Sequence, residues 1–175
     1  MNRLKLVIPN ITHKEILMDY KEEFIRNKDS MDGSAGLSIY KTFEEWYKAF
    51  NDNSNEKTVR EGLVPATTYL ALNESGNLIG MIDIRHRLNE NLLNFGGHIG
   101  YSVRKSERRK GYATEMLKLA LEKCIELNIQ EILITCDKNN VASAKTIIAN
   151  GGILENEIFD ANDNTMTQRY WIKLV

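Results

Sequence analysis

The sequence predicts a mixed α+β protein built around a mostly antiparallel sheet. Two segments with helical spacing of apolar residues come first, at about 11–28 and 42–51. Short strand patterns separated by turn residues then occupy 67–103. The remaining chain alternates strand and helix patterns and closes with a pair of strands. This order is typical of an α+β sheet flanked by helices.

The first helix is predicted over residues 11–28, because its apolar residues recur on one face: Ile16, Leu17, Tyr20, Phe24 and Ile25. Thr12 and Glu15 have the spacing of a capping box at its start. The second helix, over 42–51, also opens with a Thr-x-x-Glu pair. The small polar and glycine residues of 28–38 predict a surface loop between the two helices.

The strands of the middle region begin with a hairpin. Residues 67–73 and 78–88 have strand patterns and are joined by Glu-Ser-Gly-Asn, which favours a turn. In the second strand, isoleucines alternate with Asp83 and Arg85, which predicts one polar face. A third strand is predicted over 98–103.

The second half of the chain returns to helical spacing. An amphipathic helix is predicted from Gly111 onward. Residues 131–136 form a short, nearly continuous apolar strand, as expected in a sheet covered on both faces. A further helix is predicted to be capped by one of the two asparagines at 139–140. Residues 152–159 and 165–175 are predicted to form a closing antiparallel pair.

Length and composition indicate one domain spanning residues 1–175. A formal net charge of -1 gives no global field that would favour nucleic acid or an anionic membrane as a partner. Residues 1–16 have too short an apolar run for a signal peptide, and no stretch approaches the roughly 20 apolar residues of a membrane span. Cys124 and Cys136 lack a CxxC spacing, so we expect two buried thiols in a cytoplasmic protein.

The segment around Gly111 has the features of an anion site. Three cations, Arg108 to Lys110, come directly before this glycine, and a strand precedes them. The first N–H groups of the following helix have no intrahelical acceptors, and the helix dipole adds partial positive charge there. Neither a P-loop nor a dinucleotide fingerprint fits, because the lysine precedes the glycine and the other glycines are missing. From the local pattern alone, a solvated charged loop stays an alternative.

The context of this loop resembles a known family. Arg108-x-x-Gly-x-Ala, between a strand and a long helix, resembles the acyl-CoA pyrophosphate loop of the GNAT N-acetyltransferases, whose pattern is Arg/Gln-x-x-Gly-x-Gly/Ala. The following strand and the Asn140-x-x-Ser helix are similar to the next elements of that family. The resemblance covers about 69–159, and residues 82–103 are similar to predicted acetyltransferases from bacteria.

The resemblance implies a sheet splayed open between its central parallel strands, with the pantetheine arm of acetyl-CoA in the gap. It implies an N-acetyltransferase that uses acetyl-CoA as co-substrate and transfers the acetyl group directly to an amine in a ternary complex. The residues that it assigns to acetyl-CoA are Tyr101, Ser102, Val103, Arg108, Arg109, Lys110, Gly111, Tyr112, Ala113, Thr114, Asn140 and Ser143. Asn140 is also interpretable as a plain helix cap.

The catalytic residues are less well matched. Many family members carry a tyrosine that protonates the departing CoA thiolate, but the aligned residue here is Ile147. Tyr170 or a water is then the candidate donor, unless the thiolate leaves without a protein acid. His98 is the candidate general base, because an imidazole with an ordinary pKa of about 6.5 suits that role at neutral pH. A structural hydrogen-bonding role for His98 is the alternative.

The acceptor is expected to be a small-molecule amine, and a homodimer is compatible with the sequence. Asp83, Arg85 and His86 are candidates for its binding site. No metal ligand spacing, Gly-x-Ser-x-Gly elbow or basic stripe interleaved with aromatics is present. Because the tyrosine is missing, a CoA-binding sensor without catalysis is the second hypothesis.

Overall fold

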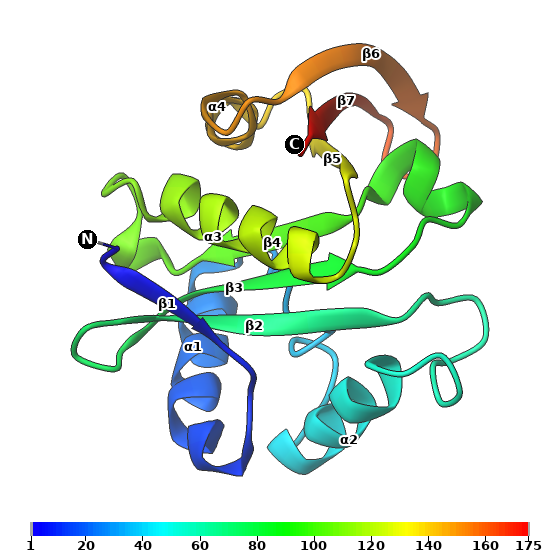
Figure 1. Cartoon of the computed structure of the whole chain (residues 1–175). Helices are drawn as coiled ribbons and strands as arrows, with labels where there is room; N and C mark the ends of the chain where they lie inside the picture. Colours follow the sequence, from blue (N-terminus) through cyan, green and yellow to red (C-terminus); the bar gives the residue numbers. More distant parts are fainter. Residues whose placement is uncertain (1, 175) are drawn as a thin grey trace.

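Two antiparallel sheets form the frame of the molecule. The computed structural model describes residues 2–174 (Figure 1). The first sheet has the order β1-β2-β3-β4, with strands Leu4–Val7, Ala66–Asn73, Leu78–Arg85 and Ile99–Val103. The second has the order β5-β7-β6, with strands Glu131–Asp137, Thr165–Lys173 and Ile153–Asp160. The predicted hairpin and the predicted closing pair are both confirmed.

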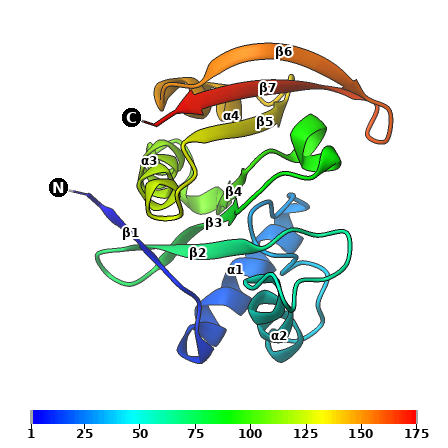
Figure 2. The same ribbon diagram turned by 45° about the vertical axis from the view of Figure 1, so that its right-hand side comes forward.

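Helices cover both faces of the first sheet. Helices α1 (Lys14–Asn27) and α2 (Phe43–Asn53) lie on one face, and α3 (Tyr112–Glu126) lies on the other, between the two sheets (Figure 2). The fourth helix, α4 (Val141–Ala149), follows β5 beside the second sheet. No helix among residues 2–174 combines the length and apolar character that a bilayer crossing requires.

Two apolar cores hold these layers together. Below the first sheet, aromatic side chains of α1 and α2, among them Tyr20 and Trp46, pack against β2 and β3. Above it, α3 packs with Met116 and Ala120 between the two sheets. Burial of a large side chain contributes about 1.5–3 kcal/mol, so these cores fix the positions of α3 and the strands around it.

The start of α1 differs from the prediction. A 3-10 turn over Ile11–His13 precedes α1, and Asn10, not Thr12, caps that turn: its side-chain oxygen accepts a hydrogen bond from the Thr12 N–H at 2.9 Å. His13 accepts from the Asn10 N–H at 3.1 Å and completes the box. Both asparagine and threonine suit a cap position. The α-helix itself begins at Lys14, with His13 as an N-cap whose side chain makes no capping hydrogen bond.

Strand β3 has the predicted alternation of apolar and polar residues, and both of its faces are covered. Asp83 is 7% exposed and accepts a hydrogen bond from the Thr68 hydroxyl at 2.7 Å. The loop between α1 and α2 lies over this face, with Gly33 against Gly100. The polar face predicted from this alternation is therefore a buried, hydrogen-bonded one.

The two sheets meet at one end and separate at the other. The His98 N–H donates to the Leu133 carbonyl at 2.7 Å, where β4 begins beside β5. Gly97 makes this approach possible, because its φ is +66° and a Cβ would lie 2.6 Å from the same carbonyl oxygen. Beyond this contact, β4 pairs with β3 and not with another described strand. The edge of β4 from Gly100 to Val103 is therefore open, as expected for a splayed sheet.

Candidate active site

A cleft of about 1100 Å³ occupies the region where the sheets separate. Its walls come from β4, the N-terminus of α3, the end of β5 and the start of α4. The loop after α1 and the β6–β7 hairpin border it as well. All residues predicted to bind acetyl-CoA except Lys110 line this cleft.

The N-terminus of α3 forms one end of the cleft. Gly111 is the helix N-cap with φ +80°, and no side chain caps this end. The atom nearest to a Cβ at Gly111 would be in the Arg3 guanidinium, 3.4 Å away, so the space above this backbone is open. Gly111, Tyr112, Ala113 and Thr114 all line the cleft. Free N–H groups and the helix dipole make this end suited to a phosphate.

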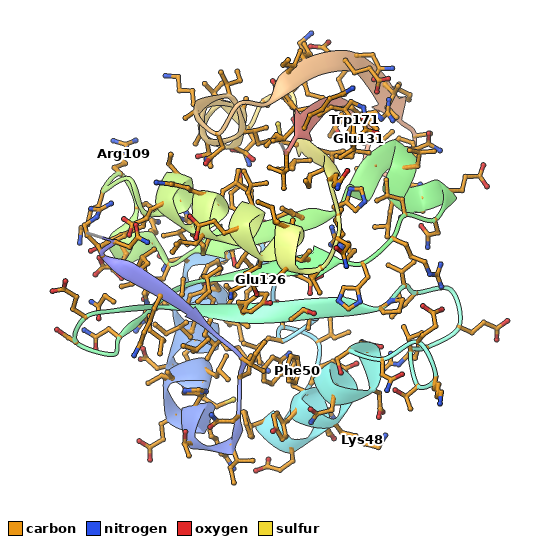
Figure 3. All side chains as sticks on the ribbon, in the orientation of Figure 1. Lys48, Phe50, Arg109, Glu126, Glu131 and Trp171 are labelled. Carbon is orange, nitrogen blue, oxygen red and sulfur yellow. The ribbon has the colours of Figure 1, made fainter. Side chains whose placement is uncertain are left out.

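The three predicted cations of this loop have different orientations. The Arg108 guanidinium lies 3.0 Å from the Asp29 carboxylate, and its Nε donates to the Val103 carbonyl at 2.9 Å. Arg109 is at the tip of the loop, where its side chain projects outward (Figure 3). Lys110 pairs with Glu107 at 2.8 Å and is not among the cleft-lining residues. Arg108 thus holds the loop against β4, and Arg109 is placed to reach a ligand.

Arg3 lies beside the start of α3, although the sequence pattern did not indicate it. Its guanidinium donates to the Lys110 carbonyl at 2.9 Å and lies 4.5 Å from the centre of the Tyr112 ring. Glu115 binds Arg3 through Nε at 2.8 Å. These partners are more than a hundred positions away in sequence, so no local motif could have revealed them.

The middle of the cleft brings β4 and α4 together. The Tyr101 hydroxyl lies 2.8 Å from Ser143 Oγ, across the gap between the sheets. Asn140 caps α4 by accepting a hydrogen bond from the Ser143 N–H at 3.1 Å. These residues and Val103 line the cleft. Ser102 also borders it, but its hydroxyl lies 3.0 Å from that of Tyr20 on the α1 side.

His98 lies outside the lining of the cleft. Its Nδ1 accepts a hydrogen bond from the Leu133 N–H at 3.0 Å, and its side chain is 7% exposed. Burial, together with the positive charge of Arg85, lowers the pKa of the imidazole to about 4. His98 is therefore neutral at pH 7, and it links the two sheets.

Neither Tyr170 nor Ile147 faces the cleft. Tyr170 is 3% exposed and donates to the Gln168 side-chain oxygen at 2.8 Å. Burial raises its pKa. Ile147 is fully buried in the core around α3, where it packs against Gly152. On α4, the neighbouring Thr146 lines the cleft instead.

The other end of the cleft contains one of the three residues predicted to bind the acceptor. Arg85 lines it and donates to the carbonyls of Gly96 at 3.0 Å and Gly97 at 3.2 Å. Asp83 lies behind Arg85 at 3.5 Å, and burial raises the pKa of this carboxyl. His86 binds the Thr67 hydroxyl at 2.7 Å and does not line the cleft.

Several lining residues at this end come from segments without a motif. They share oxygen-rich or aromatic side chains and belong to the loop after α1, the turn before β4, strand β5 and the β6–β7 hairpin: Asp32, Phe95, Thr135, Asp160, Asp163 and Thr167. Only the fold brings these segments together. Within residues 2–174, no group of three or more His, Cys, Asp or Glu side chains could hold a metal ion.

Comparisons with known proteins agree with this architecture. A family model described as an acetyltransferase (GNAT) domain matches residues 14–152. A search of curated proteins finds no significant match.

Solved structures with this fold include RimL, a ribosomal L7/L12 α-N-protein acetyltransferase in complex with coenzyme A. It is 18% identical, with a TM-score of 0.74 over 99% of this chain and 96% of its own. A Salmonella typhimurium acetyltransferase that modifies the N-terminal serine of L7/L12 is 17% identical, with a TM-score of 0.70. The match covers 100% of this chain and 97% of that protein. A chimera of the Vibrio cholerae spermidine N-acetyltransferase SpeG is 15% identical, with a TM-score of 0.64. The match covers 98% of this chain and 95% of the chimera.

Proposed function

Because the chain belongs to the acetyltransferase (GNAT) family and is an acetyl-CoA-dependent N-acetyltransferase, we propose that the cleft beside β4 binds both substrates and transfers the acetyl group directly. The observation that carries this proposal is the uncapped N-terminus of α3 at Gly111, which opens into the cleft. Direct transfer needs both reactants in one cleft, and this cleft joins an anion site to an oxygen-rich end.

The pyrophosphate of acetyl-CoA binds at the start of α3 in this proposal. The N–H groups of residues 111–114 donate to it, and Arg109 adds positive charge. The pantetheine arm then follows the open edge of β4 and pairs with its main-chain groups like an added strand. This path brings the thioester to the level of Tyr101, Ser143 and Asn140.

The acceptor amine enters from the opposite end. Three carboxylates there, Asp32, Asp160 and Asp163, favour a cationic amine. Asp32 lies on the loop after α1, Asp160 is the buried last residue of β6, and Asp163 lies in the turn that follows it. Related structures act on spermidine and on a ribosomal protein, so both small amines and N-termini are within the range of this fold. We propose a small-molecule amine, whose proton passes to solvent water at the open end before attack.

In this proposal His98 is a positioning residue and not the general base. Its Nδ1 already accepts a hydrogen bond from Leu133, and a pKa of about 4 makes it a weak base. It holds β4 against β5 and so fixes where the cleft begins. The location that we propose is cytoplasmic, since Cys124 and Cys136 are both free thiols.

A CoA-binding sensor without catalysis is the second candidate. It is favoured by Ile147, which is buried in the core at the position where many relatives carry a tyrosine. The experiment is to mix the protein with acetyl-CoA and a panel of primary amines and to follow the release of free thiol. Thiol release that depends on one of the amines supports the transferase. Calorimetric binding of CoA without thiol release from any amine supports the sensor.

A further inference from the structure

The departing thiolate of CoA needs a proton, and the residue that supplies it is not evident from the sequence. Ile147 has no acidic hydrogen and is buried away from the cleft. Tyr170 uses its hydroxyl to bind Gln168 outside the cleft lining. A donor must lie within hydrogen-bond reach of the sulfur, so it has to be sought among the hydroxyl and thiol groups that face the cleft.

Tyr101 is a tyrosine that lines the cleft at the level of α4. Its main chain belongs to β4, where it pairs with Ile82 of β3. The side chain therefore extends from the strand along which we place the pantetheine arm. Its hydroxyl crosses to α4 and lies 2.8 Å from Ser143 Oγ and 3.4 Å from the Ser143 carbonyl. The Tyr101 hydroxyl thus reaches the start of α4 from β4. Many other family members carry their tyrosine on the helix that corresponds to α4.

The surroundings of this hydroxyl keep it protonated. Burial raises the pKa of Tyr101 to about 12. The groups that face it are the hydroxyls of Ser143 and Thr146 from α4 and the Cys136 thiol from β5. Burial raises the pKa of Cys136 to about 11, so this thiol is neutral at pH 7 as well. No charged group competes for the phenolic hydrogen among these neighbours.

We propose that Tyr101 is the catalytic residue that protonates the CoA thiolate, with Ser143 orienting its hydroxyl. This inference rests on the proposed function, because it requires CoA in the cleft. The amine nitrogen forms a bond to the thioester carbonyl carbon, and the carbon–sulfur bond breaks. The sulfur takes the Tyr101 proton, and the phenolate recovers a proton from solvent through Ser143. The nitrogen loses its proton to water, so amine and thioester become amide and thiol.

The first test does not depend on knowing the acceptor. The thiol of bound CoA is titrated by the ultraviolet absorbance of its thiolate in the wild type and in Tyr101→Phe. The complex with desulfo-CoA, which lacks the sulfur, is subtracted to remove the contributions of Cys136 and the tyrosines. A hydrogen bond to a charged acceptor is lost in the variant, so the bound thiol pKa should rise by about one unit.

The second test is kinetic and uses the amine found in the thiol-release screen. Tyr101→Phe should lower kcat about a hundredfold, as expected for loss of a general acid, while the KM for acetyl-CoA stays within about twofold. The solvent isotope effect on kcat should change in the same variant. Tyr69→Phe is the matched control, because Tyr69 is a buried tyrosine of the same sheet outside the cleft lining.

The outcomes separate this inference from the proposed function. If CoA binds and the bound thiol pKa is the same in the wild type and Tyr101→Phe, Tyr101 is not the donor and the CoA site stands. If Tyr170→Phe lowers kcat while Tyr101→Phe does not, the donor is Tyr170. If the wild type shows no CoA binding by calorimetry, the proposed function and this inference both fail.

Discussion

The Nδ1 atom of His98 accepts a hydrogen bond from the Leu133 N–H at 3.0 Å, and the His98 N–H donates to the Leu133 carbonyl at 2.7 Å. One residue before β4 therefore makes two bonds to one residue of β5. This pair closes one end of the gap between the sheets, and the cleft begins beyond it. His98, for which the sequence left a base and a structural hydrogen-bonding role open, links two strands in the structure.

The first prediction concerns acid stability. The pKa of His98 is lowered to about 4 in the folded protein, against an ordinary value of 6.5. Between these values the unfolded chain binds the proton and the folded protein does not, so stability falls as the pH drops from about 6.5 to about 4. The full effect is roughly 3 kcal/mol. Urea unfolding of the wild type across this range should show the decline.

The variant His98→Gln isolates this contribution. A glutamine oxygen can accept the Leu133 N–H but does not titrate, so the variant should lose much less stability between pH 6.5 and pH 4 than the wild type. Its stability at pH 7 should be lower by about 1 kcal/mol, because the imidazole packing is lost. An unchanged pH slope in the variant would mean that other groups cause the decline.

The second prediction concerns Gly111. Its φ of +80° disfavours a side chain, so Gly111→Val should lower the free energy of unfolding by about 1–2 kcal/mol. The valine would also cover the backbone N–H groups at the start of α3, and the Kd for CoA should rise at least about tenfold. Calorimetry with CoA and denaturant unfolding measure the two effects.

Gly111→Asn is the matched control for backbone strain, because asparagine tolerates this conformation better than valine. It should restore most of the stability while CoA binding stays weakened by its side chain. If Gly111→Val binds CoA as tightly as the wild type, the phosphate site at α3 is wrong.

Local sequence patterns predicted the helices and strands, but they did not predict which residues many side chains contact. The helix after Gly111 and the capping box of α2 follow from residues within a few positions of each other. By contrast, Arg3 binds Lys110, and Tyr101 reaches Ser143, across long stretches of chain. Such contacts depend on how the strands pair and how the sheets separate. No spacing rule contains that information.

The burial of Asp83 illustrates the same limit. Alternation with isoleucine predicted a polar face but not its burial, because periodicity tells which residues share a face but not what covers it. Here the Thr68 hydroxyl and Arg85 satisfy the carboxylate, and the loop after α1 lies over the same face. The glycine-rich composition of that loop predicted a surface position, whereas its approach to Gly100 required the tertiary structure.

The third prediction separates two roles of Asn140. Asn140→Ala removes the cap of α4 and should destabilise the protein by about 1 kcal/mol. Asn140→Asp keeps an oxygen that accepts the Ser143 N–H, so thermal unfolding should remain close to the wild type. If the side chain also faces bound CoA, the new charge of aspartate should weaken CoA binding several-fold. Equal CoA affinity in Asn140→Asp and the wild type would mean that Asn140 only caps α4 and does not contact CoA.

The last prediction concerns the acceptor end. Asp163 is exposed on the β6–β7 hairpin and lines the opening of the cleft. Asp163→Asn should raise the KM of a cationic amine several-fold and leave the KM of acetyl-CoA unchanged, because it removes negative charge only where the acceptor enters. The effect should shrink at high salt, since exposed charges are screened. Glu74→Gln, at the distant β2–β3 turn, makes the same change in net charge and should leave both KM values unchanged. If the two variants behave alike, the carboxylates at the opening do not select the acceptor.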